Sequence, residues 1–365
     1  MNKTIHTLAA AFSLAAFASV AHADLKVAIA GPMTGQYASA GDQIRKGAEM
    51  AVADINAKGG VLGQKLVLEV GDDACDPKQA VSVANTMVNK KIVFMHGHWC
   101  SSSTIPASDV YAEAGIPMAT VSTNPQVTER GLKNLFRIMG RDDQQGLVAG
   151  SFIADQFKGK KVAVVDDKSA YGKGLADEIA KAMNGKGAKP ALRESITAGE
   201  KDYSALITKL KGAGVEVLAY GGYHTEVALI LRQAQQAGLK LAIVGGDTMT
   251  NSELITAAGA AADNVYFTFA PDPRKNPAAE AVVKKFREAK VEPEGYVMYA
   301  YAAMQLFADA ANQAKSAKQA DVQKTLAKGS FDTVIGKLAF DAKGDNKAPG
   351  FAVYKWQGGK YDYAK

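Results

Sequence analysis

The chain has 365 residues, of which 47% are hydrophobic and 22% are charged, and its formal net charge is +6 at pH 7. These are the proportions of an ordinary globular protein, and the length is too great for one core and suits two. The positive charges are scattered, and no basic stripe interleaved with aromatic residues marks a nucleic-acid surface, so we expect no nucleic-acid partner.

The first 23 residues have the pattern of a secretory signal peptide. Lys3 supplies a positive start, residues 8–20 form an apolar run, and Ala21-His22-Ala23 supplies the small residues that signal peptidase reads, with cleavage expected after Ala23. The alternative is a membrane anchor, but the run is too short to span a bilayer about 30 Å thick, and no second apolar segment of about 20 residues follows. Export disfavours gene regulators and enzymes that need cytoplasmic nucleotide cofactors.

Apolar runs typical of strands alternate with amphipathic runs typical of helices along most of the chain. The first series predicts strands at 25–30, 66–70, 92–96 and 118–121, and helices at 43–58, 77–89 and 102–114. Asp76 and Pro77 are good N-terminal residues for the helix at 77–89. The second series predicts helices at 144–157, 172–184, 203–211 and 225–237, and strands at 161–165, 191–196, 215–220 and 241–244. Helices at 276–289 and 296–314 and strands at 337–340 and 351–356 come last.

Strands that are apolar on both faces and separated by helices indicate buried parallel sheets. We therefore predict an α/β fold with two similar lobes, each a mostly parallel, doubly wound sheet flanked by helices. Because no Pro/Gly/Ser-rich linker separates the two series, we expect a multi-strand hinge of short crossings, which favours closure of the lobes over a ligand. Open parallel sheets bind ligands at the carboxyl ends of their strands, so the loops after the strands are the candidate binding loops.

The chain has two cysteines, Cys75 and Cys100, and each follows a predicted strand of the first series. An even pair of cysteines in an exported protein favours a disulfide, which would stabilise the fold by about 3.5 kcal/mol in the chain-entropy model. The alternative is a reactive thiol, for which nothing nearby in the sequence forms a Cys/His pair with a third orienting group.

Polar residues follow two strands of the first series. Residues 101–104 read SSST and open a helix, so their hydroxyls, the free N–H groups and the helix dipole suit a carboxylate or phosphate. The alternative is simple helix capping, which needs one hydroxyl. Residues 122–125 read STNP and would offer a carbonyl and a hydroxyl to an ammonium group, or form an ordinary Asn-Pro turn.

Three successive loops of the second series, at 168–172, 221–224 and 245–248, contain Tyr171, Tyr223 and Asp247. Tyrosines beside glycines suit a contact wall, because the ring packs while the phenol stays hydrated. Asp247 on a glycine-flanked loop would pair with a cation. Each residue alone would equally be a turn residue that faces solvent, but three such loops in one lobe favour a site.

Signals for catalysis are weak. His96 and His98 lie two residues apart without a third ligand at a supporting spacing, so roles in packing or hydrogen bonding are favoured over a metal site. The sequence contains no G-x-S-x-G elbow, P-loop or G-x-G-x-x-G fingerprint. Acidic doublets at 72–73 and 166–167 also suit turns. We expect no catalytic residue, no metal and no cofactor.

Four segments together resemble a known family. They read DDACDPKQAV at 72–81, CSSST followed by PASD within 100–109, TAGEKD at 197–202 and GGYH at 221–224. These segments are very similar to the periplasmic leucine/isoleucine/valine-binding proteins of ABC importers, and the likeness runs from about residue 25 to residue 356. The resemblance implies a type I periplasmic binding protein whose two lobes close over the ligand, with a Cys75–Cys100 disulfide.

The resemblance also implies how the two charges of an amino acid are bound. Ser101 and the helix N-terminus would hold the carboxylate. The carbonyl of Val121 or Ser122, together with the hydroxyl and amide of Thr123, would bind the ammonium group, which would also pair with Asp247.

The remaining implied contacts are aromatic. Tyr171 and Tyr223 would close over the ligand from the second lobe, and Tyr296 would form a wall of the side-chain pocket. The expected ligand-binding set is Trp99, Cys100, Ser101, Val121, Ser122, Thr123, Tyr171, Tyr223, Asp247 and Tyr296.

Two positions depart from the family pattern. Asp247 stands where the family usually has glutamate, so a water would bridge the shorter side chain to the ammonium group. Ala40 stands where well-known members have an aromatic wall, which would enlarge the side-chain pocket and admit phenylalanine or a larger apolar amino acid.

We therefore expect a monomeric periplasmic protein that captures leucine, isoleucine or valine, with phenylalanine as a further candidate, and delivers it to a membrane permease. The expected lobes are 24–141 plus 271–349 and 142–270 plus 350–365. The alternatives are the same role for aromatic or other amino acids, or an exported hydrolase.

Overall fold

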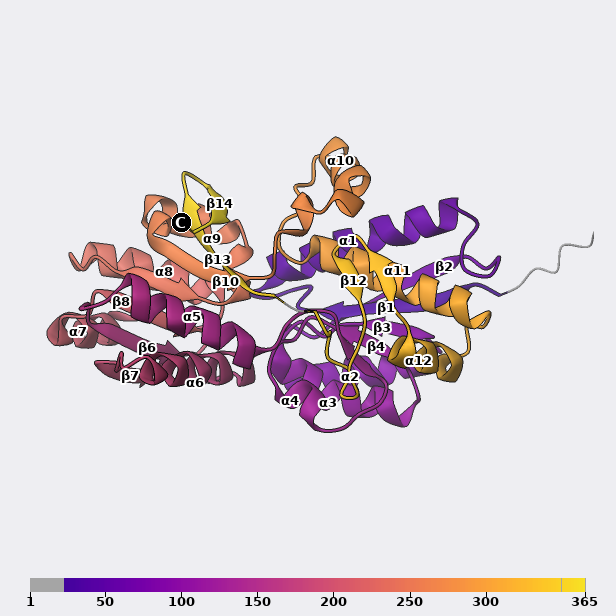
Figure 1. Ribbon diagram of the computed structural model, residues 1–365, viewed down its shortest axis with the longest axis horizontal. Helices are drawn as coiled ribbons and strands as arrows, with labels where there is room; N and C mark the ends of the chain where they lie inside the picture. The colour runs from indigo at the N-terminus through magenta and orange to yellow at the C-terminus, as the bar shows by residue number, and fades with distance from the viewer. Residues whose placement is uncertain (1–22, 349, 365) are drawn as a thin grey trace, which may run out of the picture.

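Two separate sheets, each flanked by helices, form two lobes that lie side by side (Figure 1). The computed structural model describes residues 23–348 and 350–364, so the expected signal peptide lies outside the described residues except for Ala23. In this part of the chain no helix is long and apolar enough to cross a membrane. The predicted two-lobed α/β fold is confirmed.

The sheet of the first lobe has the strand order β2-β1-β3-β4-β5, with every pairing parallel. Its strands are β1 (Leu25–Gly31), β2 (Leu66–Asp72), β3 (Phe94–His96), β4 (Met118–Thr120) and β5 (Leu135–Arg137). The helices around it are α1 (Ala38–Ala57), α2 (Pro77–Asn89), α3 (Ser101–Glu113), α4 (Gln126–Glu129), α11 (Val297–Ala314) and α12 (Gln319–Lys328).

The central strand β1 is buried on both faces. Val27 and Ile29 belong to the core cluster that contains the side chains of α1 and α11, whereas Ala28 and Ala30 belong to the cluster under α2 and α3. This alternation follows from the two-residue period of a strand, and it explains why the segment reads as a continuous apolar run.

The sheet of the second lobe has the order β14-β13-β10-β9-β8-β6-β7. Its strands are β6 (Val162–Asp166), β7 (Leu192–Ser195), β8 (Val217–Gly221), β9 (Ala242–Gly245), β10 (Val265–Phe269), β13 (Ala352–Gln357) and β14 (Lys360–Tyr363). The pairings of β13 are antiparallel, and the other pairings are parallel. The helices are α5 (Asp142–Gln156), α6 (Ala170–Gly185), α7 (Ser204–Ala213), α8 (His224–Gln236) and α9 (Glu253–Ala258), with the 3-10 turns η1 (Asp247–Thr250) and η2 (Gly259–Asn264).

The chain passes between the two sheets three times: between β5 and α5, after β10, and before β13. The second passage leads through the turns η3 (Pro273–Lys275) and η4 (Pro277–Ala279) to α10 (Glu280–Glu288), which stands apart in Figure 1. Arg137 and Asp345 pair as a parallel bridge where the first and third passages meet. The expected lobe boundaries at 141/142, 270/271 and 349/350 fall on these passages and stay a prediction.

Capping side chains set the starts of two helices. Helix α2 spans the predicted residues, because the Asp76 carboxylate accepts a hydrogen bond from the Gln79 N–H at 2.7 Å and Pro77 occupies the first turn. The hydroxyl of Ser169 accepts from the N–H of Gly172 at 2.9 Å, so α6 begins two residues before its predicted start.

Other elements differ from the prediction. Helix α1 begins five residues earlier than predicted, and the predicted helix at 276–289 is shortened to α10 because Pro277 starts a separate 3-10 turn. The predicted strand at 337–340 is β12 (Gly336–Leu338), which pairs with β11 (Phe331–Thr333) outside both large sheets. Strands β5, β10, β11 and β14 and helices α4, α9 and α12 lack a counterpart among the predicted elements.

Candidate functional site

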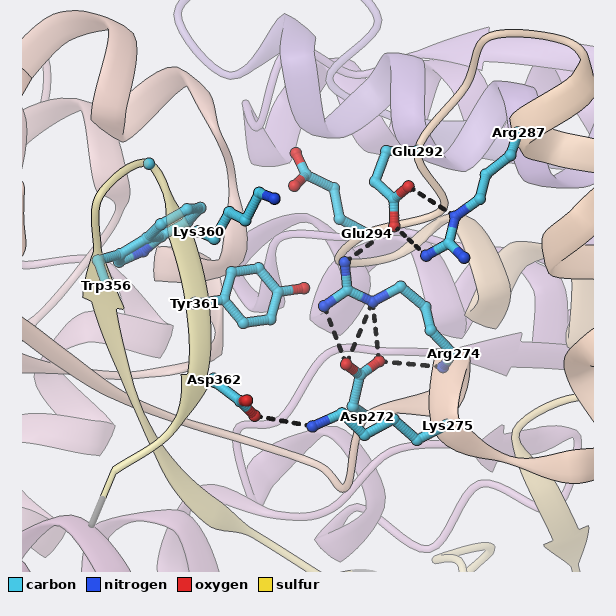
Figure 2. Close-up of a pocket in the computed structure, with 11 residues that line it drawn as sticks. Asp272, Arg274, Lys275, Arg287, Glu292, Glu294, Trp356, Lys360, Tyr361 and Asp362 are labelled. Atoms are coloured by element: carbon cyan, nitrogen blue, oxygen red, sulfur yellow. Dashed lines mark hydrogen bonds and ion pairs between the residues drawn. The ribbon is translucent and has the colours of Figure 1, made fainter.

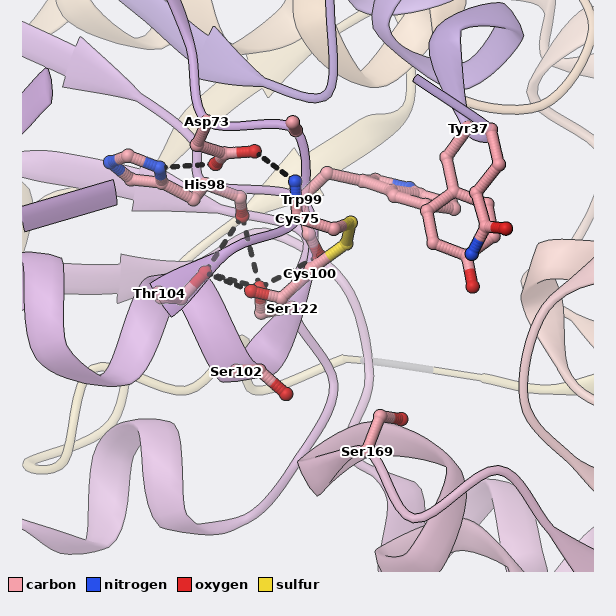
Figure 3. Close-up of a disulfide and its surroundings, with 12 residues drawn as sticks. Tyr37, Asp73, Cys75, His98, Trp99, Cys100, Ser102, Thr104, Ser122 and Ser169 are labelled. Atoms are coloured by element: carbon pink, nitrogen blue, oxygen red, sulfur yellow. Dashed lines mark hydrogen bonds and ion pairs between the residues drawn. A yellow bond between two sulfur atoms is a disulfide. The ribbon is translucent and has the colours of Figure 1, made fainter. Parts of the chain in front are cut away.

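The loops after β2 and β3 are joined by the disulfide between Cys75 and Cys100, whose Cα atoms lie 5.6 Å apart (Figure 3). The expected disulfide is thereby confirmed. Beside it, the buried carboxylate of Asp73 contacts Nδ1 of His98, and Nε2 of His98 lies 3.3 Å from the hydroxyl of Tyr111. These contacts hold the loop that precedes α3.

His96 and His98 are both buried in the first lobe and make contacts within it. His96 is fully buried, and Nδ1 of its ring lies 3.1 Å from the carbonyl of Ala119. Burial lowers the pKa of His96 to about 4, so its ring is neutral at physiological pH. Among the residues that the structure describes, no group of three His, Cys, Asp or Glu side chains could hold a metal ion.

The hydroxyl-bearing residues at 101–104 make different contacts. The hydroxyl of Ser101, at the first position of α3, accepts from the N–H of Asn124 at 3.4 Å. Ser102 accepts from the N–H of Ala170 in the second lobe at 3.1 Å, and Thr104 donates to the carbonyl of His98 at 2.9 Å. Ser101 therefore lies where the helix N-terminus meets the loop after β4, and the first turn of a helix presents N–H groups to an anion.

The loop after β4 is held by Arg137, which sequence reasoning missed. The fully buried guanidinium donates to the carbonyl of Asn124 at 3.0 Å and to the carbonyl of Ser122. The hydroxyl of Ser122 donates to the carbonyls of His98 and Trp99 at 3.0 and 2.9 Å. The polar atoms of Ser122 are thus occupied by contacts that shape the loop.

The backbone carbonyls on either side of Ser122 differ in whether they accept a hydrogen bond from the protein. The Thr123 carbonyl accepts from the N–H of Asp142 at 2.9 Å. No residue that the structure describes donates a hydrogen bond to the carbonyl of Val121. The sequence left open whether Val121 or Ser122 would offer its carbonyl to an ammonium group. Because the carbonyl of Ser122 already accepts from Arg137, this pattern favours Val121.

Asp247 lies at the start of η1 in the second lobe and is buried. Its Oδ1 accepts from the hydroxyl of Tyr171 at 2.9 Å and from Nε2 of Gln145 at 3.0 Å, and its Oδ2 accepts from the hydroxyl of Tyr296. Burial raises the pKa of Asp247, and the three hydrogen bonds oppose that rise. Tyr296, expected as a wall of the side-chain pocket, donates to this acid and helps to orient it.

A second buried acid, Asp142, was not predicted. It stands on the first turn of α5, three residues before Gln145, and neither carboxylate oxygen meets a hydrogen-bond partner among the described residues. Burial and the charge of Asp247 raise the pKa of Asp142 well above its usual value, while the Thr123 side chain and Arg137 act in the opposite direction. An acid just before a predicted helix was the available signal, but acids at helix starts are usual for helices that bind nothing.

The aromatic side chains of the expected set lie together. The ring of Tyr223 lies 5.4 Å from that of Tyr171 and 5.2 Å from that of Trp99, and the ring of Trp99 lies 5.4 Å from that of Tyr296. These rings come from both lobes and are all buried. A further ring, that of Tyr37, lies 4.4 Å from Tyr223 and was not in the expected set.

The lobes contact one another around this group of residues. Nδ2 of Asn124 donates to the carbonyl of Ala170 at 2.6 Å, and the hydroxyl of Ser39 donates to Glu253 at 2.5 Å. The hydroxyl of Tyr37 donates to Glu226 at 3.2 Å. The structure thus brings the expected residues into one enclosed region between the two sheets.

A separate pocket of about 520 Å³ lies between the passage that follows β10 and the β13–β14 hairpin (Figure 2). Several of its charges are paired with one another, among them Arg274 with Asp272 at 2.9 Å and Lys275 with Asp362 at 2.7 Å. None of the expected site residues lines this pocket. It is therefore distinct from the region between the lobes that contains the expected site residues.

Two α/β lobes that enclose hydrogen-bonding and aromatic side chains at the carboxyl ends of their strands define a two-lobed binding protein. The chain belongs to the periplasmic binding protein family, whose model matches residues 24–360.

The chain is similar to known proteins over nearly the whole length of both. It is 50% identical to the Leu/Ile/Val-binding protein homolog 1 of Brucella melitensis, over 100% of this chain and 99% of the relative. It is 45% identical to the leucine-, isoleucine-, valine-, threonine-, and alanine-binding protein of Pseudomonas aeruginosa, over 97% of this chain and 96% of the relative.

Solved structures agree with this assignment. The leucine binding protein LivK of Thermotoga maritima is 26% identical with a TM-score of 0.86, over 93% of this chain and 98% of that one. The branched-chain amino acid transporter substrate binding protein LivJ of Streptococcus pneumoniae, solved with isoleucine, is 28% identical with a TM-score of 0.84 and the same coverage.

Proposed function

We propose that this protein captures an aliphatic branched-chain L-amino acid (leucine, isoleucine or valine) between its lobes and delivers it to the membrane permease of an ABC importer. The observation that carries the proposal is the pairing of a helix N-terminus on one lobe with a buried acid, Asp247, on the other. Together they match the opposite charges of a zwitterion. The names of the relatives support the same class of ligand.

The carboxylate of the ligand meets the first lobe. The hydroxyl of Ser101 and the N–H groups of the first turn of α3 donate to it, and Trp99 and Cys100 form the adjoining wall. Charge-assisted hydrogen bonds of this kind offset the cost of removing the carboxylate from water.

The ammonium group meets both lobes. It donates to the carbonyl of Val121 and to the hydroxyl of Thr123, and it pairs with Asp247, directly or through a water. Asp142 lies at the same end, and the ammonium group favours the charged form of its carboxylate. An ammonium group supplies the donors that these buried acceptors need.

The ligand side chain lies among the rings of Trp99, Tyr223 and Tyr296, with Tyr171 closing beside Asp247. The rings offer apolar surface, whereas the hydroxyls of Tyr171 and Tyr296 are engaged by the acid. An aliphatic side chain fits this division, because it is removed from water without leaving a polar group unpaired.

The remaining parts of the proposal concern the cellular context. The protein is exported by a signal peptide cleaved after Ala23, acts as a monomer in the periplasm, and binds its ligand without catalysing a reaction. Neither the aromatic and amide-bearing amino acids nor a hydrolase gains support from the relatives.

A thermal-shift screen of the mature chain against all amino acids tests this function. Leucine, isoleucine and valine at about 100 times Kd should each stabilise the protein by about 2.7 kcal/mol. D-leucine is the matched control, because it exchanges the side chain and the hydrogen on Cα and should give a far smaller shift. A protein that no L-amino acid stabilises would contradict the proposal.

A further inference from the structure

An aromatic residue outside the expected set reaches from one lobe to the other. Tyr37 flanks the start of α1 in the first lobe, and only 4% of its surface is exposed. Its ring lies 4.4 Å from that of Tyr223 and 6.1 Å from that of Trp99. Tyr37 therefore packs against both a second-lobe tyrosine and a first-lobe tryptophan of the site.

The hydroxyl of Tyr37 contacts a buried acid of the second lobe. It donates to Oε1 of Glu226 at 3.2 Å, and Nε2 of Gln36 donates to the same oxygen at 3.3 Å. Glu226 is 1% exposed, so its charge depends on donors from the protein. From the second lobe, the N–H of Gly199 donates to Glu226 at 3.0 Å and the hydroxyl of Thr225 at 2.8 Å. The two hydrogen bonds from the first lobe would be lost if the lobes separated.

The rings form a row with an acid at each end. Tyr171 donates to Asp247 and lies beside Tyr223, and Tyr223 in turn lies beside Tyr37, which donates to Glu226. If the ammonium group meets Asp247 as proposed, a ligand side chain that points away from Asp247 along this row reaches Tyr223 first and then Tyr37. Tyr37 stands at the far end of the path.

We propose that Tyr37 is a specificity-determining residue of the amino-acid site. Its ring limits the length of the side chain that the site accepts, and its bond to Glu226 stabilises the closed lobes. Ala40, three residues along the same helix and also buried, is too small to form that wall. The ligand class is thus an aliphatic amino acid that ends before the Tyr37 ring, which excludes phenylalanine; this inference rests on the proposed function.

Two substitutions at one position separate the two roles. Tyr37→Phe keeps the ring and removes the hydroxyl, so leucine and valine should both bind about tenfold more weakly with their ratio unchanged. Tyr37→Ala removes the wall, so the affinity for phenylalanine relative to leucine should rise about tenfold or more. Titration calorimetry of leucine, valine and phenylalanine measures both effects.

Tyr203→Phe is the matched control. Tyr203 is also a buried tyrosine, and its hydroxyl has no hydrogen-bond partner among the described residues, so this variant should bind all three ligands as the wild type does. In a Glu226→Gln background, Tyr37→Phe should weaken leucine binding by less than in the wild type, because a neutral amide is the poorer acceptor.

Each negative outcome has a distinct meaning. An unchanged phenylalanine-to-leucine ratio in Tyr37→Ala overturns the role of the ring, and wild-type affinity in Tyr37→Phe overturns the role of the hydroxyl. Failure of the wild-type protein to bind any amino acid would overturn the proposed function and this inference together. Binding of leucine by the wild type with unaltered variants would overturn the inference alone.

Discussion

The guanidinium of Arg137, at the end of β5, forms a buried ion pair with Asp345, 208 residues further along the chain, with Nε 2.7 Å from Oδ1. The same guanidinium donates to the carbonyls of Ser122 and Asn124. One side chain therefore connects a passage between the lobes to the binding loop after β4.

Replacement of Arg137 by methionine should destabilise the protein by about 2–3 kcal/mol, because the buried Asp345 loses one of its two arginine partners and two buried carbonyls lose their donor. Urea unfolding followed by circular dichroism measures the loss. Lys343→Met is the control. Because Lys343 pairs with Glu129 at an exposed site, this variant should unfold at nearly the urea concentration of the wild type. Equal midpoints for the two variants would show that the buried pair contributes little.

Ser101→Ala should weaken leucine binding by about 1–3 kcal/mol, because one charge-assisted hydrogen bond to the carboxylate is lost. Ser103→Ala offers a control within the same turn, since Ser103 is buried and its hydroxyl has no partner among the described residues. Calorimetry should find wild-type affinity for that variant. Equal affinities for both variants would remove Ser101 from the ligand site.

Ligand binding should release protons at acidic pH. Burial raises the pKa of Asp247 and of Asp142, and the charge of Asp247 adds to the rise at Asp142. The ammonium group of a ligand favours the charged carboxylates and lowers both pKa values, so affinity should fall as the pH falls. Calorimetry at about pH 5 in two buffers of different ionisation enthalpy measures the released protons.

Asp142→Asn should reduce this proton release and flatten the dependence of affinity on pH. In the protein without ligand, the raised pKa values of Asp142 and Asp247 make stability depend on pH in the direction opposite to affinity. Because the folded state then binds more protons than the unfolded state, the free energy of unfolding falls as the pH rises above the usual range of a carboxyl group. Identical binding heats in the two buffers would contradict the proton release.

Removal of the disulfide by the double substitution Cys75→Ser and Cys100→Ser should destabilise the protein by about 3.5 kcal/mol, as expected for the loop it closes. Chemical unfolding of the variant and of the reduced wild-type protein should give similar midpoints. A reductant should leave the variant unchanged. Retention of full stability by the reduced wild type would argue against this constraint.

The sequence by itself determined the class of fold and the anchors of the proposed site. The apolar run of β1 and the cap at Asp76 are local properties of a few neighbouring residues, so they can be recognised in the sequence alone. Ser101 and Asp247 could be predicted as candidate binding residues because each lies in a polar loop directly after an apolar strand. The carboxyl ends of parallel strands share one edge of a sheet.

Only the tertiary structure decided which distant residues complete the region between the lobes. Asp142, Arg137 and Tyr37 look locally like a helix-start acid, a strand-end cation and a residue before a helix. Their interactions with Asp247, Asp345 and Glu226, electrostatic for the first and hydrogen-bonded for the other two, span long stretches of chain and depend on how the lobes meet. Burial of charge and the stacking of rings are properties of that assembly, and no local pattern encodes them.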